Sequence, residues 1–115
     1  MRYLLLICGD EAMRLSPEES DRMRRDTLAW VEEMDGRGIR LRGEPLRPVS
    51  DATTVRIRDG KLLVSDGPFA ETKEQVAGLN ILHCADLDEA IEVASRHPTA
   101  KIGTFELRPM LEQEE

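Results

Sequence analysis

Ten residues near the middle of the chain combine turn-forming residues with ionisable side chains. They read Ser65-Asp66-Gly67-Pro68-Phe69-Ala70-Glu71-Thr72-Lys73-Glu74. Asp-Gly-Pro is strong turn chemistry, because Gly accepts backbone angles that other residues resist and Pro fixes its own. A turn needs only about two to five residues, so this longer and more charged segment is the best candidate for a site.

The side chains of this segment have both functional and structural explanations. Asp66 can aim a carboxylate into a cavity as a base or hydrogen-bond acceptor, or it can brace its own turn through the backbone. Glu71 and Lys73 can hold a polar ligand, with Lys73 at its negative end, or form a surface ion pair of little energetic consequence. Phe69 is predicted to be an apolar plug that anchors the loop.

Charged residues of the last predicted strand extend this candidate site. Glu106 and Arg108 alternate with apolar neighbours, which places them either on the solvent side of an edge strand or in a cavity, where a buried charge must find its opposite. The predicted ligand-binding residues are Asp66, Gly67, Pro68, Phe69, Glu71, Lys73 and Arg108, and the catalytic candidates are Asp66, Glu71 and His97.

The histidines and cysteines carry weaker signals. His97 can act as an acid or base, or be favoured by the negative end of the preceding helix, and His83 ends a strand. Cys8 and Cys84 are predicted to be small buried residues that end parallel neighbouring strands and lie near one another. Zinc-type ligand spacing, a phosphate-binding glycine loop and a dinucleotide fingerprint are all missing from the sequence, so no metal or cofactor is predicted.

The composition is that of one small soluble domain. The 115 residues are 40% hydrophobic and 34% charged, and the net charge is −7. Dispersed Arg and Lys argue against direct nucleic-acid binding, and no apolar run approaches the roughly 20 residues of a membrane span. Two cysteines and no recognisable signal peptide predict a cytoplasmic protein. Residues 111–115 are predicted to be an acidic, solvated tail.

Caps, turns and periodicity predict two helices and six strands. Ser16 and Glu19 form a capping box before the first helix, and Asp86 and Glu89 form one before the second. The predicted strands span residues 3–8, 39–42, 53–58, 61–65, 76–84 and 104–108, with a break at 43–45. The inner helix faces carry Met23, Thr27, Trp30, Val31 and Met34 in the first helix and Leu87, Ala90, Ile91 and Ala94 in the second.

This order is β-α-β, an inserted hairpin, and β-α-β. Two such halves pack as a ferredoxin-like sheet with both helices on one face, and Asp59-Gly60 is a strong signal for the hairpin turn. The other face of the sheet is left bare, and a symmetric dimer that closes two sheets together covers it. The predicted fold class is therefore α+β, ferredoxin-like, with a homodimer through the sheet face.

The segment Asp66–Glu74 resembles the signature of the DGPF proteins, a branch of the YCII-related family. Met1–Leu6, Ala85–Ala90 and Phe105–Pro109 also resemble that family, so the likeness covers nearly the whole chain and makes residues 1–110 a single domain. The resemblance implies a small bacterial protein with the dimeric α+β barrel fold. Some relatives in this branch sit beside, or are fused to, extracytoplasmic-function sigma factors.

The wider family includes an enzyme that removes chloride from a hydroxylated aromatic. Its proposed dyad is a His in the first helix and an Asp before a Pro after the second helix. In this chain Thr27 stands where the His would be, and His97-Pro98 looks like the Asp-Pro position. Thr27 cannot act as a general base near neutral pH, so neither residue of that dyad is carried over.

Two hypotheses of function follow. The first is a small-molecule-binding protein or enzyme with a polar cavity near Asp66–Lys73, which takes a small polar or anionic ligand. The second is an accessory interaction protein associated with sigma-factor-dependent transcription, which acts through protein contacts rather than DNA. An enclosed pocket with converging ionisable groups favours the first hypothesis, and charged side chains that point outward over a flat patch favour the second.

Overall fold

The computed structural model describes residues 1–112 and contains the predicted elements in the predicted order. Its helices are α1 (Pro17–Gly36) and α2 (Leu87–Ser95), with short 3-10 helices η1 (Val49–Asp51) and η2 (Pro98–Lys101). Its strands are β1 (Arg2–Gly9), β2 (Arg40–Pro45), β3 (Thr53–Arg58), β4 (Lys61–Asp66), β5 (Gln75–His83) and β6 (Thr104–Pro109). Most of the predicted acidic tail, residues 113–115, lies outside the described residues. Neither helix in residues 1–112 is long and apolar enough to cross a membrane.

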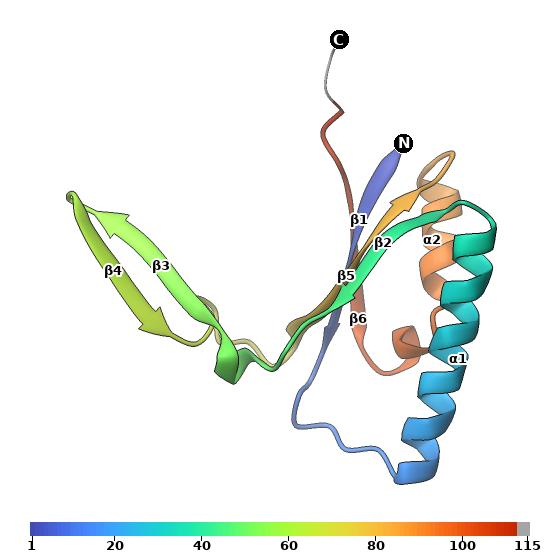
Figure 1. Cartoon of the computed structure of the whole chain (residues 1–115), viewed down its shortest axis with the longest axis horizontal. Helices are drawn as coiled ribbons and strands as arrows, with labels where there is room; N and C mark the ends of the chain where they lie inside the picture. The colour runs from blue at the N-terminus through green and yellow to red at the C-terminus, as the bar shows by residue number, and fades with distance from the viewer. Residues whose placement is uncertain (113–115) are drawn as a thin grey trace.

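Four of the strands form one sheet in the order β2-β5-β1-β6, and every neighbouring pair is antiparallel. The antiparallel order arises because each β-α-β crossover skips over the strand that lies between its two strands. Both helices cover the same face of this sheet (Figure 1). The α+β, ferredoxin-like fold predicted from the sequence is confirmed.

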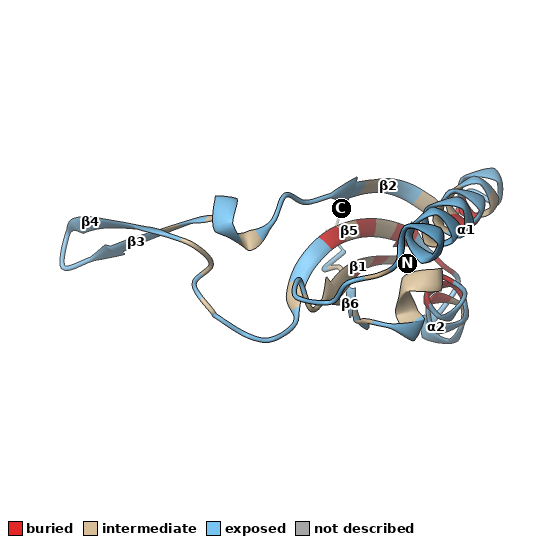
Figure 2. Ribbon diagram, turned by 90° about the horizontal axis from the view of Figure 1, so that it is seen from below, coloured by how far each residue is buried: buried red, intermediate tan, exposed pale blue. Residues whose placement is uncertain are grey.

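The core lies between this sheet and the two helices (Figure 2). Alternate residues of the central strands face it, so that Tyr3 of β1 lies opposite Leu82 of β5. In α1 the inner face is the predicted one, with Trp30 and Met34 buried. The buried apolar residues are Tyr3, Leu5, Trp30, Met34, Ile39, Leu82, Cys84, Ala90, Val93 and Ala94.

Both helices begin at the predicted capping residues. The Ser16 hydroxyl accepts a hydrogen bond from the Glu19 N–H at 3.1 Å, and the Glu19 carboxylate accepts from the Ser16 N–H at 3.0 Å. Asp86 likewise accepts from the Glu89 N–H at 2.9 Å. The Glu89 carboxylate, however, accepts from the Ala85 N–H, so the second predicted capping box is only half formed.

Two local predictions are wrong. Leu87 and Ile91 of α2 are 48% and 50% exposed, because the face that packs on α1 and the sheet is centred on Val93 instead. The predicted break after residue 42 does not occur, since β2 continues through Gly43 to Pro45. A proline is tolerated there because β2 is an edge strand, where one side needs no ladder hydrogen bond.

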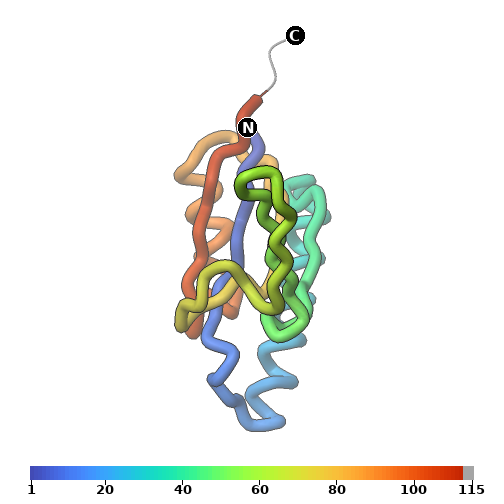
Figure 3. Tube along the Cα trace, turned by 90° about the vertical axis from the view of Figure 1, so that its left-hand side faces the viewer, coloured from blue at the N-terminus to red at the C-terminus, as the bar shows by residue number. Residues whose placement is uncertain are grey.

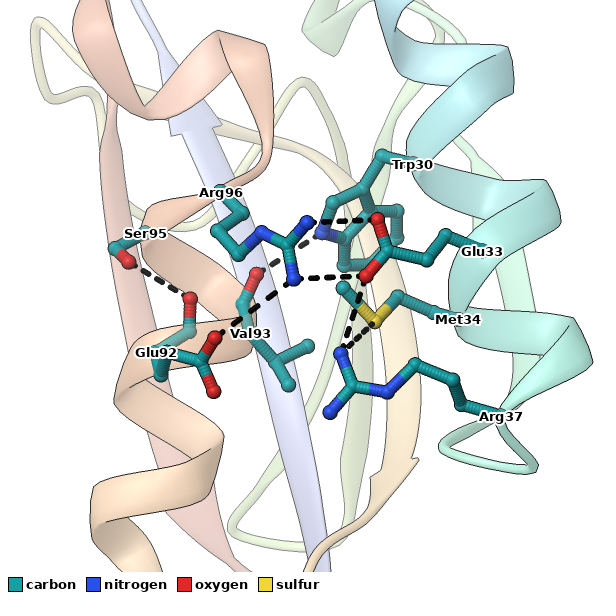
Figure 4. Close-up of polar contacts among 8 residues, drawn as sticks. All are labelled: Trp30, Glu33, Met34, Arg37, Glu92, Val93, Ser95 and Arg96. Carbon is teal, nitrogen blue, oxygen red and sulfur yellow. Dashed lines mark hydrogen bonds and ion pairs between the residues drawn. The ribbon is translucent and has the colours of Figure 1, made fainter.

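Helices α1 and α2 are joined by one buried hydrogen bond and an exposed charge cluster (Figure 4). The Trp30 indole N–H donates to the Val93 carbonyl at 2.9 Å, and this carbonyl also accepts from the Arg96 N–H at 3.3 Å. Arg96 contacts both oxygens of the Glu33 carboxylate, at 2.8 and 2.7 Å. Arg37 contacts the same carboxylate at 3.1 Å. These contacts fix the end of α2 beside the last turns of α1.

Strands β3 and β4 form a separate hairpin, residues 53–66, which we call the arm. The arm projects from the side of the sheet that carries no helix, and in Figure 3 it lies in front of the sheet. Asp59 and Gly60 form its turn with φ values of 52° and 73°, which confirms the predicted hairpin. One face of the arm is an exposed apolar surface, made of Val55, Ile57, Leu62 and Val64.

The second face of the four-stranded sheet carries no helix and is called the helix-free face. Its centre is formed by the half-buried side chains of Leu4, Leu6, Leu79 and Ile81. Ion pairs flank this apolar centre on both edge strands, Arg42 with Glu44 on β2 and Arg108 with Glu106 on β6. The predicted bare face is therefore apolar at its centre and charged at its edges.

The two cysteines lie at opposite ends of the sheet, and the prediction that they end parallel neighbours is wrong. Strands β1 and β5 are antiparallel, so Cys8 lies opposite Val76, whereas the Cys84 N–H donates to the Met1 carbonyl. Burial, and after it nearby carboxylates, raise the pKa of both thiols. A raised thiol pKa leaves little thiolate at neutral pH, which fits structural rather than reactive cysteines.

Candidate functional site

The charged segment Ser65–Glu74 connects the arm to β5. Gly67 has a φ of 91°, its N–H donates to the Ala52 carbonyl at 2.8 Å, and the Thr54 hydroxyl donates to the Gly67 carbonyl at 2.8 Å. Asp66 ends β4 opposite Thr53 and is exposed. These backbone-directed hydrogen bonds hold the turn, and the Asp66 carboxylate is not one of their partners.

The segment lines one side of a groove of about 460 Å³, which we call the signature groove. Glu71 and Lys73 both line it, beside Asp10 and Glu11 from the loop after β1. The Glu11 carboxylate accepts a hydrogen bond from the Val49 N–H at 3.0 Å, which fixes the opposite wall. Two predicted ligand-binding residues, Gly67 and Pro68, complete the rim on the arm side.

Other predicted site residues lie elsewhere. Phe69 is 80% exposed, so the prediction that it plugs and anchors the loop is wrong. Arg108 lies on the helix-free face, opposite Leu4 and paired with Glu106, and it is not part of the signature groove. Within one chain, the structure therefore groups Glu71 with Lys73 but leaves Asp66 and Arg108 apart from them.

A second hollow of about 450 Å³ lies between α1 and the sheet, and we call it the interlayer pocket. Its walls are mostly apolar, and Thr27 and His97 both line it. By the family resemblance, these two positions correspond to the His and the Asp of the dyad in the wider family. The lining residues are Ile7, Thr27, Leu28, Trp30, Val31, Arg40, Gly43, Glu44, Pro45, Ala77, Gly78, Leu79, Asn80, His97 and Thr99.

His97 is held as a neutral ring at the back of this pocket. It is 5% exposed and lies edge-on to Trp30 and Phe105, with ring centroids 4.8 and 5.2 Å away. Burial lowers its pKa to about 4, which outweighs any stabilisation of the charged ring by the end of α2. The Nδ1 atom accepts from the Thr99 N–H at 3.1 Å, so the proton of the neutral ring sits on Nε2.

Asn80 supplies a second inward-facing polar group. Its side chain is buried, and its Oδ1 accepts from the Arg40 Nε–H at 2.9 Å, which fixes the amide orientation. Arg40 is held in turn by Asp35 at 3.0 Å. No buried side-chain nitrogen or oxygen in residues 1–112 lacks a hydrogen-bond partner. Asn80 makes its side-chain hydrogen bond through Oδ1, so its amide nitrogen is not fully enclosed on this wall of the pocket.

The polar groups of the pocket are mainly hydrogen-bond donors. The His97 Nε2–H and the Asn80 amide donate, and the Thr27 hydroxyl can donate or accept. A histidine with a pKa of about 4 is a weak base at neutral pH. The arrangement therefore suits binding and polarising a carbonyl or carboxylate on an apolar molecule, more than abstracting a proton from it.

Sequence reasoning named His97 as a catalytic candidate and Thr27 only as the residue in place of the dyad His, and it missed Asn80 as a site residue. Asn80 carried a usable signal, because it shares its strand face with the buried Leu82. A polar side chain on a buried strand face must find partners. The partner, Arg40, comes from a strand 40 residues earlier in the chain, and one sequence does not show that proximity.

Comparisons with known proteins agree with the family resemblance seen in the sequence. The chain matches the YCII-related domain over residues 1–114. It is also 38% identical, over 114 residues, to an uncharacterized protein of Rhizobium meliloti (strain 1021), and the match covers 96% of this chain and 92% of that protein. The relative has no assigned activity in its name, so these matches identify a family and not a reaction.

Proposed function

The chain belongs to the YCII-related family, and from that membership we propose that it is a small-molecule-binding protein whose ligand occupies the interlayer pocket. The observation that carries the proposal is the pair of buried donors, His97 Nε2–H and the Asn80 amide, at the back of an apolar hollow. The ligand class is a small molecule with an apolar body and a carbonyl or carboxylate group. The segment Asp66–Glu74 resembles the DGPF signature, which supports placing the chain in the DGPF branch of this family.

The signature groove is a second candidate site for a polar or anionic ligand. Lys73 supplies a cation and Glu71 a carboxylate, and both stand on a segment held by the Gln75 amide, which donates to the Ala70 and Thr72 carbonyls at 3.0 Å each. Three carboxylates of this groove, on Asp10, Glu11 and Glu71, oppose an anion. The interlayer pocket therefore has the stronger support.

A symmetric homodimer through the helix-free face is part of the same proposal. The centre of that face is apolar and only half buried in one chain, and such a surface is stabilised when a partner removes it from water. Two copies related by a twofold axis bring the same stripe together and enclose a barrel between their sheets. Ion pairs on both edge strands then form the charged rim.

The test is a thermal-shift screen of small carboxylic acids and ketones, followed by two matched variants. Thr27→Leu fills the interlayer pocket, and Thr72→Leu makes the same change in the signature groove. We expect the hits that stabilise the parent chain to lose their effect in Thr27→Leu and keep it in Thr72→Leu. The opposite pattern places the ligand in the groove, where Asp66→Ala then tests the Asp66 carboxylate.

A screen without any stabilising compound contradicts the small-molecule proposal. The second candidate function then gains, namely an accessory protein of sigma-factor-dependent transcription that acts through protein contacts. The observation that favours it is the exposed apolar surface of the arm, with Phe69 at its base. Saturable binding to a purified extracytoplasmic-function sigma factor is the result that supports it.

A further inference from the structure

The arm exposes an unusual amount of apolar surface for a segment that makes so few contacts. On one face Val55 pairs with Val64 across the hairpin, and Ile57 pairs with Leu62. These four side chains are between 59% and 66% exposed. An isolated two-stranded hairpin is marginally stable in water at best, so a surface of this kind indicates a contact that the single chain does not supply.

The charges of the arm are opposite to those of the rest of the chain. Arg56, Arg58 and Lys61 give the arm three cations against the carboxylates of Asp59 and Asp66, a net charge of +1. Because the whole chain has a net charge of −7, the remaining residues carry −8. A positively charged arm is attracted to the remaining residues, here called the body, of another copy of this chain.

The position of the arm indicates the same partner. It projects on the side of the helix-free face, while both helices lie on the other side of the sheet (Figures 1 and 2). A second copy that packs on the helix-free face therefore lies on the same side as the arm. By twofold symmetry its own arm points back toward the first copy. One partner can thus cover both unpartnered apolar surfaces of the chain.

We propose that the arm of each copy docks through its apolar face, formed by Val55, Ile57, Leu62 and Val64, against the body of a second copy of this chain. The inference rests on the proposed sheet-face dimer for its geometry, but it adds a separate contact with its own residues. The basic side chains on the opposite face of the arm remain at the rim of that contact, where they face the acidic surface of the partner. They also keep a free arm from pairing edge to edge with other hairpins.

The experiment measures the dimer dissociation constant of the full chain by sedimentation velocity. Ile57→Lys places a charge on the docking face, and Leu63→Lys places the same charge on the opposite face of the same arm. We expect Ile57→Lys to raise the dissociation constant by about tenfold or more, because each dimer loses two buried Ile side chains. Leu63→Lys is expected to change it by less than about twofold. Far-UV circular dichroism checks that each variant keeps the fold.

Failure of this inference can be told apart from failure of the proposed dimer. Leu79→Lys disrupts the helix-free face without touching the arm. If Leu79→Lys dissociates the dimer and Ile57→Lys does not, the sheet-face dimer stands and arm docking is wrong. If Ile57→Lys dissociates the dimer and Leu79→Lys does not, the arm docks but the sheet-face geometry is wrong. A parent chain that stays monomeric at all concentrations overturns both.

A zero-length cross-link tests the charge pairing directly. The chain has three lysines, Lys61, Lys73 and Lys101, and only Lys61 lies on the arm. In a mixture of isotope-labelled and unlabelled copies, carbodiimide is expected to join Lys61 of one copy to a carboxylate of the other. Cross-links from Lys61 that form only within one copy contradict the proposed docking.

Discussion

Strands β4 and β5 follow one another in the chain and are both rich in apolar residues, yet one is exposed to solvent and the other is partly buried. Every residue of β4 is exposed, whereas alternate residues of β5 are buried against the helices. The difference is in their neighbours, because β5 lies between β1 and β2 while β4 pairs only with β3. An apolar strand sequence thus predicts a strand, but the topology decides whether anything covers its apolar side chains.

The largest expected effect on stability comes from making the same Leu→Ala substitution once in the body and once in the arm. Leu5 is fully buried and Leu62 is 66% exposed. Leu5→Ala leaves a cavity in the core and is expected to lower the free energy of unfolding by about 3 kcal/mol. Leu62→Ala is expected to change it by less than about 0.5 kcal/mol when urea unfolding is measured in dilute solution.

The two substitutions remove the same atoms, so any difference reports the surroundings. Similar losses for both variants mean that the arm is packed in the isolated chain, which contradicts its separation from the body. A loss for Leu62→Ala that grows with protein concentration is instead a sign of the dimer contact, since association stabilises the folded chain by mass action.

The stability of the body is also expected to depend on pH, because burial lowers the pKa of His97. Its pKa falls from 6.5 to about 4 on folding, so the unfolded chain binds the proton more tightly. The stability that comes from the neutral ring is complete above pH 6.5 and is lost as the pH falls toward 4. The loss amounts to about 3 kcal/mol at most.

His97→Asn is the matched control for this pH dependence. Asn keeps a side-chain acceptor for the Thr99 N–H but has no titrating group. Urea unfolding between pH 7 and pH 4 is expected to show a smaller slope for His97→Asn than for the parent. Parallel slopes mean that carboxylates elsewhere in the chain carry the acid sensitivity, and the buried neutral His97 then has no measurable effect.

The sequence was enough to predict the fold because its signals are local. The Ser16–Glu19 capping box, the Asp59-Gly60 turn and the inner face of α1 each depend on residues within a few positions of one another, and all three are confirmed. The order of these elements then allows few topologies. The predictions were wrong where burial or position depends on a neighbour that is distant in the chain, as for the exposed Ile91 of α2 and the separated cysteines.

The candidate site was predicted less completely for the same reason. The charged segment Ser65–Glu74 stands out in the sequence, and the structure gives it a groove that holds Glu71 and Lys73. The interlayer pocket depends instead on residues from α1, from the segment after α2 and from the three strands β1, β2 and β5. Its pairing of Asn80 with Arg40 joins positions 40 residues apart. A local pattern cannot contain such a contact, so the members of this pocket other than His97 were not predicted as site residues.

The smallest expected effects on stability come from substitutions at two glycines, Gly103 and Gly60, which are required for different reasons. A Cβ at Gly103 would lie 2.4 Å from the Cys8 carbonyl oxygen, so the backbone at the start of β6 must move. A Cβ at Gly60 would meet nothing within 4 Å, but its φ of 73° is one that Ala resists. The first glycine is needed for space within the body, and the second for the turn of the arm.

Gly103→Ala is expected to lower the free energy of unfolding by about 2 kcal/mol through forced displacement of packed backbone. Gly60→Ala is expected to strain the hairpin turn by about 1 kcal/mol while leaving the urea midpoint of the body nearly unchanged, because the arm does not pack on the core. Amide hydrogen exchange separates the two, with faster exchange confined to β3 and β4 in Gly60→Ala. Faster exchange that spreads from Gly60 into β1 and β5 contradicts the independence of the arm, and it means that the hairpin and the sheet unfold as one cooperative unit.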